Sequence, residues 1–326
     1  MNILVTGGAG FIGSNIVETL IQKSNVNQVR VLDNLETGYF KNIEKFTNNP
    51  KFEFIEGDIR DFNTCLKATE NIDLVCHQAA LGSVPRSIAD PLTTNAVNIT
   101  GTLNVFYAAK ENGVKRVVYA ASSSTYGDSQ KLPKIEKRIG NPLSPYAVTK
   151  LVNELYANVF ASLYDVEFIG LRYFNIFGPN QSPHGAYAAV VPLFMQAILE
   201  GKRPTINGDG LQSRDFTYVA NAVQANVNAL FTTNKKAVNQ VYNVAVGDQT
   251  TLVDMFDILK NIAKSDINPI FGSSRSGDIK HSLADISKAK KLLDYDPSVN
   301  ISKGLELAFD WYKTNFINQE VSNTAY

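Results

Sequence analysis

Two side chains that could move a proton lie in the segment Tyr146-Ala147-Val148-Thr149-Lys150. The segment follows Pro145 and opens an apolar-periodic stretch, so we expect a helix with Tyr146 and Lys150 on one face, four residues apart. A free tyrosine, with a pKa near ~10, is a poor base at neutral pH, but a nearby positive charge favours its phenolate. The pair therefore predicts a base for a hydroxyl proton. An isolated Tyr-x-x-x-Lys is more often a surface pair, so the interpretation needs support from elsewhere.

That support comes from a cluster of hydroxyl side chains. Ser122 ends the β-branched run 117–122, and Ser123, Ser124 and Thr125 follow it directly. In open parallel sheets, active sites lie outside the carboxyl ends of the strands. We therefore expect these hydroxyls to face the same crevice as the tyrosine.

A glycine-rich turn follows the first expected strand. Gly7, Gly10 and Gly13 stand between the run Asn2–Thr6 and a helical pattern, a spacing that lets the backbone approach a pyrophosphate at a helix N-terminus. Asp33 ends the second expected strand twenty positions after Gly13, where a carboxylate can accept both hydroxyls of an adenosine ribose. The same carboxylate would repel a 2′-phosphate. The sequence thus predicts a dinucleotide site that favours NAD over NADP.

The elements that must position these groups repeat as strand, turn and helix. Strand-like runs cover residues 2–6, 29–33, 52–58, 74–80, 117–122 and 168–174. Their nearly continuous apolar character predicts a Rossmann-type, doubly wound parallel α/β sheet. A cluster of turn formers at 178–183 marks the expected boundary between an NAD-binding domain, 1–178, and a smaller mixed α/β substrate lobe, 179–326. We expect helices near 190–200, 219–231 and 252–263, a strand at 241–246 that returns to the first sheet, and a frayed tail after Phe316.

Composition narrows the class of protein. The 326 residues include 31 basic and 31 acidic side chains, so no overall field favours nucleic acid or an anionic membrane. Only Cys65 and Cys76 are present, and no leader-like or membrane-spanning run is evident, which favours the cytoplasm. The three histidines have no metal-ligand spacing, and we expect no metal.

Taken together, the motifs resemble the extended short-chain dehydrogenases/reductases over nearly the whole chain. The resemblance rests on the glycine turn, residues 77–80, the serine cluster, Tyr-x-x-x-Lys and residues 171–178. It implies that Ser122 is the catalytic hydroxyl, that Tyr146 is the base, and that Lys150 binds the nicotinamide ribose and tunes the tyrosine. The residues that it assigns to NAD are Gly7, Gly10, Phe11, Ile12, Gly13, Asp33, Asn34, Asp58, Ile59, Gln78, Ala79, Ala80, Asn98, Tyr146, Lys150 and Tyr173. Asp58 could instead be a strand-end cap.

Within that family, sugar 4,6-dehydratases carry an Asp-Glu pair after the catalytic hydroxyl. Ser123 and Ser124 stand there instead, and serine does not readily exchange protons near pH 7. The remaining chemistry is reversible oxidation at C4 of a sugar, followed by return of the hydride to the other face. The resemblance therefore implies 4-epimerisation through a 4-keto intermediate, with NAD kept on the enzyme.

The second lobe resembles the nucleotide-binding part of the family, and arginine suits a diphosphate. The closest resemblance is to the UDP-N-acetylglucosamine 4-epimerases of polysaccharide pathways, in residues 79–87 and 277–282. There a tyrosine at the position of Ser282 would exclude a 2-acetamido group, whereas serine leaves room. The residues assigned to the UDP-sugar are Gly82, Ser83, Ser122, Ser123, Ser124, Tyr146, Asn175, Ala189, Val190, Asn207, Arg214, Arg275, Asp278 and Ser282.

Other interpretations stay open. Each arginine could be a surface ion-pair residue, and Ser282 a helix-entry residue. UDP-glucose and UDP-galactose are alternative substrates, and another nucleotide-sugar oxidoreductase, exchanging free NAD, is an alternative enzyme. A non-catalytic nucleotide sensor would tend to lack the Tyr-Lys pair. A homodimer is expected from the resemblance alone.

Overall fold

The computed structural model describes residues 1–184, 188–273 and 280–323. A seven-stranded, wholly parallel sheet forms its centre, in the order β11-β6-β5-β4-β1-β2-β3. The strands are β1 (Asn2–Thr6), β2 (Gln28–Asp33), β3 (Phe52–Glu56), β4 (Leu74–His77), β5 (Arg116–Ser122), β6 (Glu167–Tyr173) and β11 (Gln240–Val244). The Rossmann-type fold expected from the sequence is confirmed.

Successive residues of each strand face opposite sides of the sheet. In β1, Ile3 and Val5 join one core cluster, whereas Leu4 between them joins the other. Helices α1 and α8 pack together over the first side, and α2, α5 and α6 cover the second. Burial on both sides explains why the strands are almost continuously apolar.

The helices around the sheet are short except for α6, whose first turn carries Tyr146. They are α1 (Phe11–Ile21), α2 (Phe62–Ala68), α3 (Val84–Ala89), α4 (Pro91–Asn95), α5 (Thr102–Glu111), α6 (Pro145–Leu163) and α8 (Val219–Phe231). A π-helical turn, residues 96–101, joins α4 to α5, and a 3₁₀ turn, residues 123–126, follows β5.

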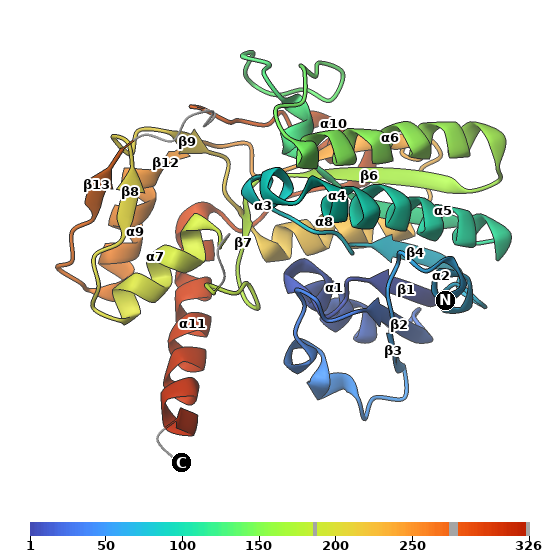
Figure 1. Ribbon diagram of the computed structural model, residues 1–326, viewed down its shortest axis with the longest axis horizontal. Coiled ribbons are helices and arrows are strands. Elements are labelled where there is room, and N and C mark those ends of the chain that lie inside the picture. Colours follow the sequence, from blue (N-terminus) through green and yellow to red (C-terminus); the bar gives the residue numbers. More distant parts are fainter. Residues whose placement is uncertain (185–187, 274–279, 324–326) are drawn as a thin grey trace.

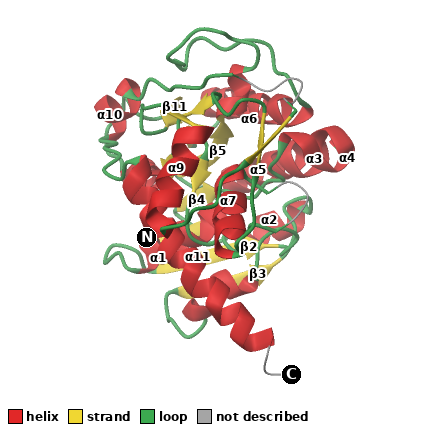
Figure 2. Cartoon of the chain, turned by 90° about the vertical axis from the view of Figure 1, so that its left-hand side faces the viewer, coloured by secondary structure: helices red, strands yellow, loops and turns green. Residues whose placement is uncertain are grey.

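The second lobe stands beside the sheet (Figure 1), and α11 runs from it toward the C-terminus (Figure 2). Its short strands pair as β7 with β10, β9 with β12, and β8 with β13. Its elements are β7 (Ile176–Phe177), α7 (Val190–Leu199), β8 (Thr205–Asn207), β9 (Ser213–Arg214), β10 (Thr217–Tyr218), β12 (Thr250–Thr251), α9 (Leu252–Ala263), β13 (Ile270–Gly272), α10 (Ser287–Leu293) and α11 (Ile301–Asn323). Helix α8 and strand β11 come after residue 178 in the chain, but α8 covers one face of the large sheet and β11 extends its edge. A domain boundary drawn after residue 178 therefore separates these two elements from the sheet to which they belong.

The structure differs from the sequence interpretation mainly at element ends. Strands β3 and β4 end at Glu56 and His77, earlier than expected, because the chain then turns away toward the cavity described below. After Phe316, where the sequence predicts a frayed tail, the backbone is helical as far as Asn323. Leu305 and Phe309 are buried and fix the first part of α11 in the core. The unfavourable nucleation of the helix is complete there, so each further turn only extends the existing helix.

No helix within residues 1–184, 188–273 and 280–323 is both long and apolar enough to cross a membrane.

Candidate active site

A cavity of about 1130 Å³ lies along the carboxyl ends of the strands, which is larger than most small-molecule sites. The order of the sheet reverses between β1 and β4, and ligands of such folds bind at this switch point. Most of the residues expected from the sequence line this one cavity. They are Gly7, Gly10, Phe11, Ile12, Gly13, Asp33, Asn34, Asp58, Ile59, Gln78, Ala79, Ala80, Gly82, Ser83, Ser122, Ser123, Ser124, Tyr146, Lys150, Tyr173, Asn175, Arg214 and Ser282.

The glycine turn leaves the backbone bare where a pyrophosphate would lie. Gly7 has φ +69°, and a Cβ on it would meet the backbone nitrogen of Ala79 at 2.6 Å. A Cβ on Gly13 would lie 2.1 Å from the carbonyl oxygen of Gly7. Helix α1 begins after Gly10 with no side-chain cap, so its first N–H groups are left for a ligand. This geometry fits the diphosphate of NAD.

Asp33 is held at the end of β2 by two backbone groups. Its Oδ2 accepts the N–H of Ala9 and its Oδ1 that of Leu35, both at 2.9 Å. Burial raises the pKa of this carboxyl, and the two hydrogen bonds act in the opposite direction. Each oxygen keeps a second lone pair, so the fixed carboxylate can accept two ribose hydroxyls.

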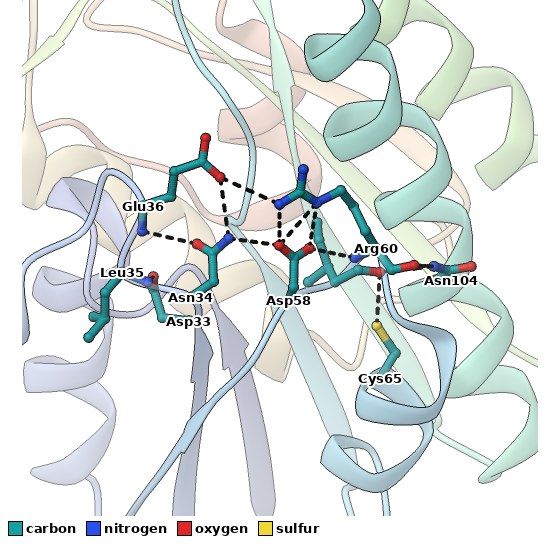
Figure 3. A network of polar contacts seen from close by, with 9 residues as sticks. Asp33, Asn34, Leu35, Glu36, Asp58, Arg60, Cys65 and Asn104 are labelled. Atoms are coloured by element: carbon teal, nitrogen blue, oxygen red, sulfur yellow. Dashed lines mark hydrogen bonds and ion pairs between the residues drawn. The ribbon is translucent and has the colours of Figure 1, made fainter.

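Asp58 follows β3, and its carboxylate already accepts hydrogen bonds from other side chains of the protein (Figure 3). Its carboxylate accepts hydrogen bonds from the Arg60 side chain, the shortest at 2.5 Å, and from Asn34 Nδ2 at 2.9 Å. Hydrogen bonding to Arg60 is the main cause that lowers the pKa of Asp58 to about 2. Arg60 also lies 3.7 Å from Glu36, so the network ties the loop after β2 to the loop after β3.

Ser122 and Tyr146 meet on the other side of the switch point. Ser122 ends β5, and Tyr146 lies in the first turn of α6, which Ser144 caps by accepting the N–H of Ala147 at 3.1 Å. Burial raises the pKa of Tyr146, whereas its hydrogen bond with Ser122 lowers it. A phenol that binds a hydroxyl in a cavity can exchange a proton with an alcohol placed beside both.

Lys150 lies one turn further along α6, on the same face as Tyr146. Its side chain is buried, Nζ donates to the carbonyl oxygen of Ala120 at 2.8 Å, and it lies 5.9 Å from the centroid of the Tyr146 ring. Burial lowers the pKa of Lys150 to about 8. The expected pairing on one helical face is therefore present.

Two segments that are distant in the chain also line the cavity. Ser282 is positioned by its N–H, which donates to the carbonyl oxygen of Ser213 in β9 at 3.1 Å. Gly82 has no atom within 4 Å of where a Cβ would stand, and Ser83 caps α3 with φ +90°. Small side chains thus leave this wall open.

Four expected contacts lie outside the cavity. Asn98 is buried behind it, where its side chain bonds the N–H and carbonyl of Leu81 and so supports the loop before Gly82. Ala189, Val190 and Asn207 are in the second lobe but do not line the cavity. Arg275 and Asp278 lie outside the described residues.

Several lining residues were missed by the sequence interpretation. Glu36, Lys134, Leu143 and Gln181 all line the cavity. Glu36 lies three positions after Asp33, which is a usable signal, but the other three belong to long loops without a motif. Within the described part of the chain, no group of three or more His, Cys, Asp or Glu side chains is arranged to hold a metal.

A doubly wound sheet, a glycine turn and a Ser-Tyr-Lys set at its switch point define an NAD-dependent enzyme of the short-chain dehydrogenase/reductase type. Residues 3–245 match the NAD dependent epimerase/dehydratase family, and the chain belongs to that family.

Several relatives resemble the chain over almost its full length. A putative UDP-glucose 4-epimerase of Methanocaldococcus jannaschii is 38% identical over 96% of this chain and 99% of its own. The structure of a UDP-N-acetylglucosamine 4-epimerase from Methanobrevibacter ruminantium, in complex with UDP-N-acetylmuramic acid, is 41% identical with a TM-score of 0.89, covering 98% of both chains. A Bacillus cereus UDP-glucuronic acid 4-epimerase in complex with UDP-glucuronic acid and NAD is 34% identical with a TM-score of 0.89, covering 97% of this chain and 100% of that one. The chain is thus an NAD-dependent 4-epimerase of UDP-sugars.

Proposed function

We propose that the protein interconverts UDP-N-acetylglucosamine and UDP-N-acetylgalactosamine through a 4-keto sugar. The observation that carries this proposal is the open wall of Gly82, Ser83 and Ser282 in the same cavity as Ser122 and Tyr146. A 2-acetamido group needs such room. The similarity to the M. ruminantium UDP-N-acetylglucosamine 4-epimerase supports the same substrate.

In the proposed mechanism Tyr146 takes the proton of the sugar 4-hydroxyl, and Ser122 donates a hydrogen bond to the reacting oxygen. When bound, NAD would supply the hydride acceptor at C4 and then the hydride donor. The Lys150 ammonium would hold the nicotinamide ribose and, together with the positive charge of the oxidised cofactor, would stabilise the Tyr146 phenolate. When the sugar turns about its diphosphate, Tyr146 returns the proton and the configuration at C4 is inverted.

Ser123 and Ser124, where a dehydratase would have an acid and a base, favour epimerisation over loss of water. We assign the adenosine and pyrophosphate of NAD to the Gly7–Gly13 turn, Asp33 and the loops after β2 and β3. We assign the UDP diphosphate to Arg214 with Arg275. We assign the uridine to Asp278 and to Ala189, Val190 and Asn207, which belong to the second lobe but lie outside the cavity described above, and Asn175 to a diphosphate oxygen.

We propose two functional lobes, an NAD-binding part within residues 1–178 and a UDP-sugar-binding part within 179–326, with α8 and β11 serving the first. A cytoplasmic location stays a prediction from the sequence.

A homodimer through α6 is part of the same proposal. Leu155, Val159 and Leu163 are more than half exposed and lie at spacings of four along this helix. Such a stripe can pair with its own copy across a twofold axis. Light scattering during gel filtration should give twice the chain mass, and a mass of one chain would contradict the dimer.

The test of the function uses purified protein with no added cofactor. We expect UDP-N-acetylglucosamine to yield the galacto epimer, seen by NMR of the anomeric proton, because NAD is regenerated at the site. UDP-glucose in a parallel reaction measures the alternative substrate. Turnover only with added NAD, together with net NADH formation, would instead show a dehydrogenase.

A further inference from the structure

Ser122 makes two contacts with Ser124. The Ser122 Oγ accepts the backbone N–H of Ser124 at 3.1 Å, and the two Oγ atoms are 2.9 Å apart. Both contacts arise because Ser122 is the cap of the 3₁₀ turn that contains Ser124. The turn therefore brings the Ser124 hydroxyl back onto the last residue of β5.

A serine hydroxyl has one proton to donate and two lone pairs. The Ser124 N–H uses one lone pair of Ser122 without ambiguity. If the Ser124 hydroxyl donates to the second, the Ser122 proton is the only group left for the oxygen of Tyr146. A hydrogen bond donated by Ser122 to the Tyr146 oxygen would favour the phenolate, and the interaction with Ser122 acts to lower the pKa of Tyr146.

We propose that Ser124 is a positioning residue that holds Ser122 as a hydrogen-bond donor toward Tyr146 and the reacting oxygen. This role rests on the proposed roles of Ser122 and Tyr146. In this proposal Ser124 acts on the reaction through Ser122 and does not contact the sugar directly.

The direction of this hydrogen bond matters because Ser122 is needed as a donor throughout the reaction. It stabilises the Tyr146 phenolate before the proton is taken, and the carbonyl oxygen of the keto sugar afterwards. The Ser124 hydroxyl strengthens that donor by polarising the chain of hydrogen bonds. Neither serine loses its own proton.

The opposite direction would have Ser122 donating to Ser124 and Ser124 facing the substrate. Ser124 would then act on substrate binding, and Tyr146 would lose the donor that favours its phenolate. The two directions therefore predict different kinetic effects.

The experiment compares Ser124→Ala, Ser124→Thr, Ser122→Ala and the double alanine variant as NAD-bearing holoenzymes. Measurements are kcat and KM on the UDP-hexose that the wild type epimerises, at several pH values. A second readout is the ultraviolet titration of the Tyr146 phenolate, taken as the difference from Tyr146→Phe.

For Ser124→Ala we expect kcat to fall about tenfold with KM nearly unchanged, and the apparent pKa of Tyr146 to rise by about one unit. Ser124→Thr keeps the hydroxyl and should stay close to wild type. Because Ser124 acts through Ser122, the double variant should be no slower than Ser122→Ala alone. Ser123→Ala is the matched control from the same turn, and it should leave the apparent pKa of Tyr146 unchanged whatever it does to KM.

The proposal is overturned if Ser124→Ala changes only KM, if the two alanine effects multiply, or if the Tyr146 titration does not move. If the Ser124→Ala protein loses its NAD, the activities of Ser124→Thr and Ser124→Val are compared instead. These two side chains have nearly the same shape, but only threonine carries a hydroxyl. Equal activity of that pair contradicts the proposal. A failure of the catalytic assignment would differ, because Ser122→Ala and Tyr146→Phe would then be fully active.

Discussion

Replacing Ser282 by tyrosine should lower activity on the acetylated UDP-sugar more than activity on the plain UDP-hexose. Ser282 lines the same cavity as Gly82 and Ser83, and its backbone hydrogen bond to Ser213 is left intact by the substitution. The added ring enters the space proposed for the 2-acetamido group. Overpacking of this kind costs about 1–3 kcal/mol, which corresponds to about a 5- to 150-fold loss in kcat/KM for the acetylated substrate.

The plain hexose lacks the acetyl group and should be converted at a rate closer to wild type. The informative quantity is therefore the ratio of kcat/KM for UDP-N-acetylglucosamine to that for UDP-glucose, measured by NMR or by chromatography of the epimers. Ser282→Ala is the control, because it removes the hydroxyl without adding volume, and its ratio should stay near that of wild type. NAD content checks that each variant is folded.

One result would refute this reasoning. An unchanged ratio in a folded, NAD-bearing Ser282→Tyr protein that remains active would mean that residue 282 does not face the C2 substituent. It would remove the main support for an N-acetylhexosamine substrate. Loss of both activities together would instead mean general disruption of the pocket.

Three further substitutions test other parts of the site. Tyr146→Phe should reduce turnover by at least about 10²-fold while NAD stays bound, and near-normal turnover would contradict its role as base. Asp33→Ala should weaken NAD and narrow the difference between its Kd and that of NADP; unchanged NAD affinity would place the ribose elsewhere. Arg60→Met removes the partner that lowers the pKa of Asp58 to about 2 from the ordinary 3.8, a stabilisation present above pH ~4 and lost as the pH falls toward 2. Since the pair is partly exposed, the difference in unfolding free energy should be under about 1 kcal/mol at pH 7 and vanish only as the pH falls below about 2; a difference that persists there would exclude the ion pair as its cause.

The sequence by itself determined the groups whose geometry is local. Tyr146 and Lys150 share a face because the helix repeat places residues four apart together. Asp33 and Ser122 reach the cavity because each ends a strand of a parallel sheet, and all such ends lie at one edge. The glycine turn is likewise a property of one short segment.

Only the tertiary structure decided which distant loops complete the cavity. Lys134 and Gln181 lie in loops whose own sequence carries no periodicity, and they line the cavity because the second lobe packs beside the sheet. Asn98 lies in the π-helical turn 96–101, and its side chain is used to hold the backbone of Leu81 in the loop after β4, so it does not line the cavity. Asp58 is occupied by Arg60 and Asn34 because two βα loops meet above β2 and β3. Periodicity and spacing describe one element at a time, whereas these contacts depend on how elements far apart in the chain are brought together.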